Sequence, residues 1–128
     1  MKGINRISNV RGMTLLEIMV VIAIIGILSS AIGVSVVTYM EKAKVDAAKA
    51  QLRQVANAVE LYAVENDWPT DLREVLDAKM VKEKQLVDPW KQDLLYSYPA
   101  SRGNDNRYDL CSKGPDKVDG NDDDVCND

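Results

Sequence analysis

A single carboxylate inside a long apolar segment is the residue with the clearest chemical consequence in this sequence. Glu17 is the only charged residue between Met13 and Val37. An ionised side chain in a membrane-length apolar segment is costly, so it persists where a partner or a function compensates the charge. We therefore interpret Glu17 as a functional residue.

A second group of carboxylates lies close to the C-terminus. Five aspartates fall within nine residues of a glycine-containing loop: Asp116, Asp119, Asp122, Asp123 and Asp124. Packed together without a cation they would repel one another, and hard oxygen ligands on a hinged loop suit Ca²⁺, which takes about six to eight oxygens. The spacing is not that of an EF-hand. From the residues alone, a calcium site and a solvated acidic tail are equally open.

Two cysteines, Cys111 and Cys126, bracket the same loop with fourteen residues between them. An oxidising compartment permits a disulfide, which would stabilise the fold by about 3 kcal/mol for a loop of this size. A zinc or redox site is the weaker interpretation, because the chain has no histidine and the spacing is not Cys-x-x-Cys.

The composition argues against catalysis and against nucleic-acid binding. The chain has no histidine, and no serine or cysteine lies beside a plausible base, so we predict that the protein is not an enzyme. It carries 20 acidic and 16 basic residues, and the basic residues are not clustered as phosphate binding requires. We therefore expect no nucleic-acid partner.

The elements that must position these residues begin with the apolar segment itself. From Met13 to Val37 it has 25 residues. As a helix it would be about 37 Å long, enough to cross an apolar bilayer core of about 30 Å. Lys2, Arg6 and Arg11 precede it, so the positive-inside rule keeps the leader in the cytoplasm and sends the C-terminal portion across the membrane.

The helix is expected to continue beyond the apolar segment as an amphipathic rod. Apolar residues recur there at alternating spacings of four and three, at Ala48, Leu52, Val55, Val59 and Tyr62. Residues 66–69 end the rod, because proline cannot occupy a helix interior. A short helix from Asp71 to about Ala78 follows, with Thr70 as its expected N-cap.

Two strand-like runs separated by a loop rich in Pro, Gly and Asn predict an antiparallel hairpin. The runs are residues 94–98 and 107–111, and the loop is 99–106. We expect the hairpin to lie across the apolar stripe of the long helix. The sequence therefore predicts an α+β fold, in which a long N-terminal helix packs against a small antiparallel sheet with a thin core.

The junction between the basic leader and the apolar segment resembles the class III leader of type IV pilins and type II secretion pseudopilins. Gly12 is followed by Met13-Thr14-Leu15-Leu16-Glu17. The resemblance implies that a prepilin peptidase cleaves after Gly12, that Met13 becomes the N-methylated first residue, and that Glu17 takes the family's signature fifth position. Two residues depart from the family, Met13 for the usual Phe and Val34 for a helix-bending Pro found in many relatives.

A charge pair explains why a filament would need this arrangement. Cleavage creates an α-ammonium at Met13, which the Glu17 carboxylate of a neighbouring subunit can neutralise inside an apolar bundle. Assembly would then depend on cleavage. A plain signal anchor, by contrast, gains nothing from Glu17.

Further landmarks narrow the resemblance to the major pseudopilin of type II secretion systems. They are Trp68-Pro69-Thr70, Val87-Asp88-Pro89-Trp90, and Ser112-Lys113-Gly114-Pro115-Asp116 leading to Gly120-Asn121-Asp122-Asp123-Asp124-Val125. Residues 88–90 by themselves indicate only a turn with a buried indole. The resemblance implies a pilin-like fold, with a leader at 1–12, a transmembrane and filament-core helix at 13–38, and a periplasmic head at 39–128 that includes a calcium loop at 111–126.

The resemblance also implies which residues hold calcium. The expected side-chain ligands are Asp116 and two of the three adjacent aspartates Asp122, Asp123 and Asp124. The expected backbone ligands are Ser112, Lys113 and Val118. The cysteine pair is not a usual feature of the family, which leaves two alternatives: a Cys111–Cys126 disulfide supports the calcium loop, or it partly replaces the metal.

The function implied by the resemblance is that of a structural subunit of the periplasmic pseudopilus, anchored in the inner membrane by one helix. The expected partners are copies of itself in a helical homopolymer, minor pseudopilins, the prepilin peptidase and the inner-membrane secretion platform. Such a filament helps to drive folded proteins through the outer membrane. The alternatives are a type IV pilin of a surface filament for adhesion, motility or DNA uptake, and a membrane-anchored calcium-binding module that never polymerises.

Overall fold

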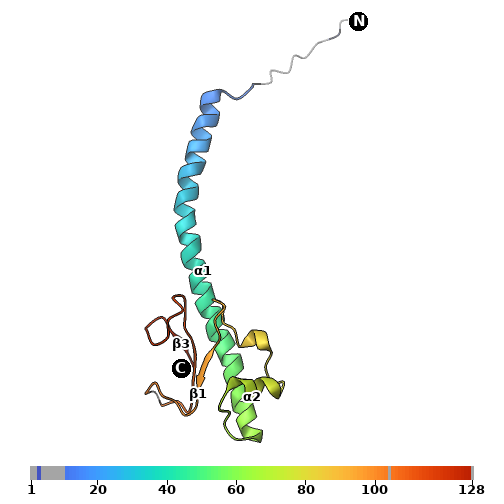
Figure 1. The fold of residues 1–128 in the computed structure, drawn as a ribbon. Helices are drawn as coiled ribbons and strands as arrows, with labels where there is room; N and C mark the ends of the chain where they lie inside the picture. Colours follow the sequence, from blue (N-terminus) through green and yellow to red (C-terminus); the bar gives the residue numbers. More distant parts are fainter. Residues whose placement is uncertain (1–2, 4–10, 104, 128) are drawn as a thin grey trace. The chain divides into compact units, whose positions relative to one another are not determined.

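The structure is a computed structural model that describes residues 3, 11–103 and 105–127 of the 128-residue chain (Figure 1). It divides into two compact units, Met1–Val37 and Thr38–Asp128. Helix α1, Leu15–Glu65, contributes residues to both. Most of the leader predicted at 1–12 lies outside the described residues, so its prediction is not tested by the structure.

In the first unit the chain is helical without interruption from Leu15 onward. The helix is long and apolar enough to cross a membrane by length and composition. Val34 lies within the regular helix, as expected where no proline breaks the hydrogen-bond ladder. The hydroxyl groups of Ser29 and Ser30 donate to the carbonyl oxygens of Ile25 and Ile27, each at 2.7 Å. These polar groups are thereby satisfied within the helix, as a lipid environment requires.

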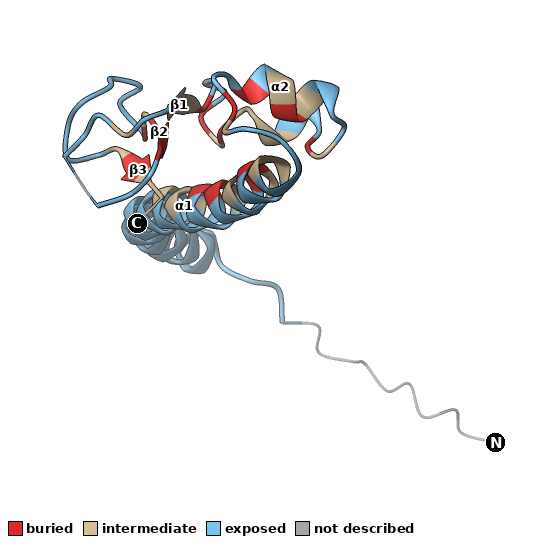
Figure 2. Ribbon diagram, turned by 90° about the horizontal axis from the view of Figure 1, so that it is seen from below, coloured by how far each residue is buried: buried red, intermediate tan, exposed pale blue. Residues whose placement is uncertain are grey.

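In the second unit helix α1 buries one stripe of side chains. Ala48, Leu52, Val55 and Val59 are at most 1% exposed, which confirms the predicted apolar stripe. Figure 2 shows these buried positions on the side of the helix that faces the strands. The helix ends at Glu65, just before the Trp-Pro sequence that was expected to stop it.

Helix α2, Leu72–Asp77, confirms the predicted short helix but not its predicted cap. The N-cap is Asp71 rather than Thr70: the backbone of Asp71 is extended, and its Oδ1 accepts from the Arg73 N–H at 3.0 Å. The Thr70 N–H and hydroxyl both donate to Glu74 Oε1, at 3.0 and 2.5 Å. Both residues have side chains suited to capping, so their types alone could not decide between them.

Three short antiparallel strands in the order β1-β2-β3 form the sheet: β1 Leu95–Ser97, β2 Asp109–Ser112 and β3 Val125–Cys126. β1 and β2 confirm the predicted hairpin, with Tyr96 opposite Leu110. β3 was not predicted, because two residues are too short to show a periodicity. It brings the C-terminal segment back to the sheet, so this segment does not end as a solvated acidic tail.

The core of the second unit lies between the stripe of α1, the sheet and α2. Helix α2 contributes Val75 to this core, and the strands and loops contribute Val81, Trp90, Tyr108, Leu110 and Val125. A single-turn 3-10 helix, Glu83–Gln85, connects α2 to the segment before the sheet. This core holds the two ends of the C-terminal loop, at β2 and β3, against one another.

Candidate functional site

Glu17 lies in the first turn of helix α1 and is exposed. Its backbone N–H donates to Thr14 Oγ1 at 3.2 Å, so Thr14 acts as a cap at the start of the helix. A carboxylate in the first turn also interacts favourably with the positive end of the helix dipole. The position is therefore suited to an ionised side chain within an otherwise apolar segment.

The apolar side chains around Glu17 are exposed on all sides of the helix. Leu15, Leu16 and Ile27 are each at least 70% exposed, and every residue from Leu15 to Val37 is exposed. An apolar surface of this extent is not stable in water. It requires lipid, other helices, or both around it.

The C-terminal loop is closed by a disulfide between Cys111 and Cys126, with an S–S distance of 2.09 Å. The two cysteines lie directly opposite one another in the β2–β3 pair. Gly114 has a φ of +71°, and a Cβ at this position would overlap the carbonyl oxygen of Asp123. The two ends of the loop are thus held together by a covalent bond and by a close backbone approach that requires glycine.

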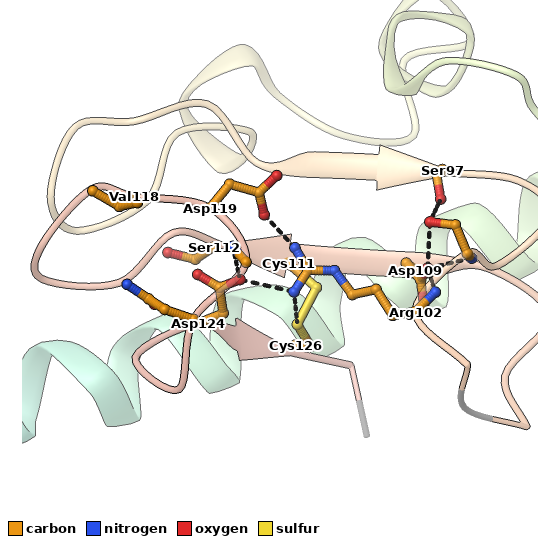
Figure 3. A network of polar contacts seen from close by, with 12 residues as sticks. Ser97, Arg102, Asp109, Cys111, Ser112, Val118, Asp119, Asp124 and Cys126 are labelled. Atoms are coloured by element: carbon orange, nitrogen blue, oxygen red, sulfur yellow. Dashed lines mark hydrogen bonds and ion pairs between the residues drawn. A yellow bond between two sulfur atoms is a disulfide. The ribbon is translucent and has the colours of Figure 1, made fainter.

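A guanidinium group from another loop reaches the acidic segment (Figure 3). Arg102 Nη1 lies 2.7 Å from Asp124 Oδ2, and Arg102 Nη2 pairs with Asp119 Oδ1. The Asp124 side chain is only 4% exposed, and its Oδ2 also accepts from the Gly120 N–H at 2.9 Å. One cation therefore bridges two aspartates of the loop that was predicted to bind calcium.

Arg102 and Asp124 stabilise each other's charged form. Burial alone would raise the pKa of Asp124, but the hydrogen bonds from Arg102 and from the Gly120 N–H outweigh it, and the pKa is lowered. The same hydrogen bond to Asp124 is the main reason why the pKa of Arg102 is raised. Both groups therefore remain ionised in the folded head at neutral pH.

The structure does not bring the expected calcium ligands together. The Asp116 carboxylate accepts from the Val118 N–H at 3.0 Å and from the Asn121 side chain, while Asp122 and Asp123 are exposed. Within the part of the chain that the structure describes, no group of three or more acidic or cysteine side chains could hold a metal. As placed here, the residues do not fit a calcium ion, which takes about six to eight oxygens.

The residues expected to supply backbone ligands lie in three different settings around the loop. Ser112 is fully buried in β2, and its hydroxyl donates to Asp88 Oδ2 at 2.6 Å. Val118 lies on the exposed part of the loop, and its N–H is bound to Asp116. Lys113 follows β2 and is half-buried. Calcium at this loop stays a prediction from the family resemblance.

Two residues important for this region, Arg102 and Asp109, were not singled out from the sequence, and a third, Asp88, was quoted only as part of a landmark motif and a turn. Arg102 lies in the loop at 99–106, which was interpreted only as a connection. Asp109 Oδ2 accepts from the backbone N–H groups of Ser101 and Arg102, at 2.6 and 3.0 Å, and so positions the arginine. Asp88 is 4% exposed and joins its own turn to Ser112. The only sequence signal was an isolated arginine in a chain whose C-terminal loop is strongly acidic.

Comparisons with known proteins agree with the two resemblances found in the sequence, that of the leader junction and that of the head. The model of the prokaryotic N-terminal methylation motif matches residues 7–33, and the model of type II secretion system protein G matches residues 35–128. The chain is 37% identical to the type II secretion system core protein G of Escherichia coli (strain K12), over 91% of this chain and 90% of that protein.

Two further relatives carry the same description. The core protein G of Pseudomonas aeruginosa is 30% identical, over 91% of this chain and 93% of that protein. The core protein G of Aeromonas hydrophila is 32% identical, over 91% and 90%. Since one family model covers most of the chain and the relatives align over nearly its whole length, this chain belongs to the type II secretion system protein G family.

Proposed function

We propose that this protein is the structural subunit of a type II secretion pseudopilus, in which copies of the chain polymerise through their N-terminal helices. The observation that carries the proposal is the exposed apolar segment of α1 with Glu17 in its first turn. The family match and the relatives' description as type II secretion system core protein G support it. A helix with these properties needs a membrane before assembly and other copies of itself afterwards.

The leader would control this step. The match to the N-terminal methylation motif supports cleavage after Gly12 and methylation at Met13 by a prepilin peptidase. The new ammonium group at Met13 would pair with Glu17 of a neighbouring subunit, so that neither charge remains alone in an apolar environment. We further propose a single-pass inner-membrane precursor with its head in the periplasm, consistent with the basic residues before the helix.

The remaining partners belong to the same proposal: minor pseudopilins, the peptidase and the inner-membrane secretion platform.

A structural role rather than catalysis fits how the head uses its buried carboxylates. Asp88 and Asp109 accept hydrogen bonds from backbone N–H and hydroxyl groups. Such contacts position loops. The domain limits 13–38 and 39–128 are part of this proposal.

Replacing the charge of Glu17 tests the proposal directly. We expect Glu17→Gln to leave membrane insertion and leader cleavage intact while filament assembly falls at least about tenfold, because about 1.4 kcal/mol lost per contact is enough for that change. Assembly would be measured by cross-linking between subunits and by electron microscopy of sheared filaments. Cleavage would be followed by mass spectrometry of the N-terminus.

A matched control uses a carboxylate on the same helix but outside the apolar segment. Glu65→Gln alters an exposed residue at the other end of α1 and should leave assembly unchanged. Filaments of normal length and number from the Glu17→Gln protein would contradict the charge-pairing proposal. Mature subunits that retain residues 1–12 would contradict processing.

A further inference from the structure

A cationic side chain of the protein itself, Arg102, lies at the acidic loop. Arg102 contacts Asp119 and Asp124, which lie on either side of Gly120, and its Nη1 is 3.7 Å from Cys126 Sγ. Figure 3 shows the Arg102 side chain extending past Cys111 toward Asp119 and Asp124. The arginine thus connects the acidic segment, the disulfide and the hairpin loop.

The arginine is held at its backbone as well as at its guanidinium group. Asp109, which is 4% exposed on β2, accepts from the N–H groups of Ser101 and Arg102. Its Oδ2 also lies 3.3 Å from the Ser101 hydroxyl. The Arg102 side chain is 30% exposed, so it is neither free in solvent nor completely removed from it. The planar guanidinium group presents its donors in a rigid fork, so arginine loses less conformational entropy per hydrogen bond than a flexible ammonium side chain.

This arrangement competes with a divalent cation. Asp124 is the most buried of the four aspartates expected as calcium ligands, and one of its oxygens is occupied by Arg102 and the Gly120 N–H. Its other oxygen is buried and accepts no hydrogen bond from residues 11–103 or 105–127. One available oxygen is far fewer than the roughly six to eight oxygen ligands that calcium needs. An ion placed there would also be repelled by the adjacent guanidinium group.

We infer that Arg102 is the resident cation of the C-terminal loop and acts in place of a calcium ion. Together with the Cys111–Cys126 disulfide it fixes the loop against the sheet, so the stability of the head does not depend on calcium. Asp119, which was not among the expected calcium ligands, is a partner in this arrangement, whereas Asp116 and Asp122 are not. The inference concerns the head alone and holds whether or not Glu17 directs assembly.

The test compares melting temperatures of the full chain in detergent micelles, with EDTA and with millimolar Ca²⁺. Both tryptophans, Trp68 and Trp90, belong to the second unit, so their fluorescence reports the unfolding of the head. We expect the melting temperature of the wild-type protein to be the same in the two solutions. A rise of more than about 4 °C with Ca²⁺, or calcium binding at micromolar concentration by titration calorimetry, would overturn the inference.

Two variants test the arginine itself, both measured in EDTA. Arg102→Gln leaves the buried Asp124 without its cation and should lower the melting temperature by at least about 4 °C, the shift produced by about 1 kcal/mol in a domain of this size. Asp119→Asn removes the more exposed partner and should cause a smaller decrease in a protein that still folds. Arg53→Gln, at an exposed position of α1, should cause none. Unchanged melting of both Arg102→Gln and Asp119→Asn would contradict the inference.

Discussion

At the residue scale, buried carboxylates determine how the head is held together. Asp88 is the clearest example. Its Oδ1 accepts from the N–H groups of Trp90 and Gln92, at 3.0 and 2.8 Å, and its Oδ2 accepts from the Ser112 hydroxyl at 2.6 Å. One side chain therefore shapes the turn that places the Trp90 indole and ties this turn to β2. The buried indole, at 7% exposure, agrees with the prediction from residues 88–90.

Removal of this carboxylate should destabilise the head strongly. Asp88→Ala leaves three donors without an acceptor, and we expect a loss of about 3 kcal/mol or more in the free energy of unfolding, because hydrogen bonds to charged groups contribute about 1.5–3 kcal/mol each. Asp88→Asn keeps one acceptor oxygen and should cost less. Asp93→Ala, at an exposed carboxylate in the same segment, serves as the control. Denaturant unfolding followed by tryptophan fluorescence measures all three; equal values for Asp88→Ala and Asp93→Ala would contradict this role.

Two tyrosines give the head a defined response to alkaline pH. Burial is the main cause that raises the pKa of Tyr96 and of Tyr108 from 10.0 to about 12. The unfolded chain therefore loses these protons at lower pH than the folded chain. The stability that depends on the neutral phenols is complete below pH 10 and is lost as pH rises through about 12.

We expect the tyrosinate absorbance of the folded protein to include a late component that develops near pH 12. Tyr108→Phe should reduce this component, and the melting temperature of the wild-type protein should fall over the same pH interval. The Tyr108 hydroxyl lies within 3.5 Å of the Ala56 carbonyl oxygen and 3.4 Å of Glu60 Oε1, which are contacts of the neutral phenol. Titration of all tyrosines in one step near pH 10 would show that these phenols are not protected by the fold.

At the element scale, helix α1 serves two environments with one backbone conformation. Its first part is exposed and apolar on every side, whereas its second part buries a single stripe against the head. The change follows from composition: after Glu17, the helix carries no further charged residue until it has passed Val37. A helix that is apolar all round suits lipid or a helical bundle, and one with a single apolar stripe suits a small domain.

The stripe can be tested with two leucines on the same helix. Leu52 is 1% exposed and Leu61 is 55% exposed. We expect Leu52→Ala to lower the free energy of unfolding by about 2–5 kcal/mol, because a cavity remains in the core, and Leu61→Ala to change it by less than about 0.5 kcal/mol. Thermal melting followed by tryptophan fluorescence compares the two. Similar losses at both positions would mean that the stripe does not face the core.

At the scale of the whole molecule, the packed core that stabilises the fold and the apolar surface proposed for assembly belong to different units. Among the residues that the structure describes, the hydrophobic core cluster belongs to the second unit, Thr38–Asp128, as does the disulfide. The exposed apolar surface of residues 15–37 belongs to the first. Removal of the first unit should therefore take away the membrane-binding surface and leave the packed core intact.

We expect a fragment of residues 38–128 to fold without detergent. It should be monomeric in gel filtration and show a cooperative melt, with the near-ultraviolet circular dichroism of packed aromatic rings. In this unit the Trp68 ring contacts those of Tyr98 and Tyr108, and the Tyr108 ring also contacts that of Tyr96, at centroid distances of 5.6–5.7 Å. The full chain should aggregate in the same buffer. A fragment without a cooperative transition would show that the head needs the apolar part of α1 to fold.

The sequence by itself determined the features that depend on local pattern. The apolar segment with Glu17, the stripe from Ala48 to Val59 and the hairpin were evident from composition and periodicity, because each is a pattern within a short stretch of sequence. The family was indicated by the resemblance of short motifs to those of known pseudopilins. The tertiary structure alone decided what surrounds the acidic loop. The approach of Arg102 to Asp119 and Asp124, the strand β3 and the link from Asp88 to Ser112 join residues distant in the chain. Such contacts depend on how the loops cross the sheet, and the sequence carries no periodic signal for that arrangement.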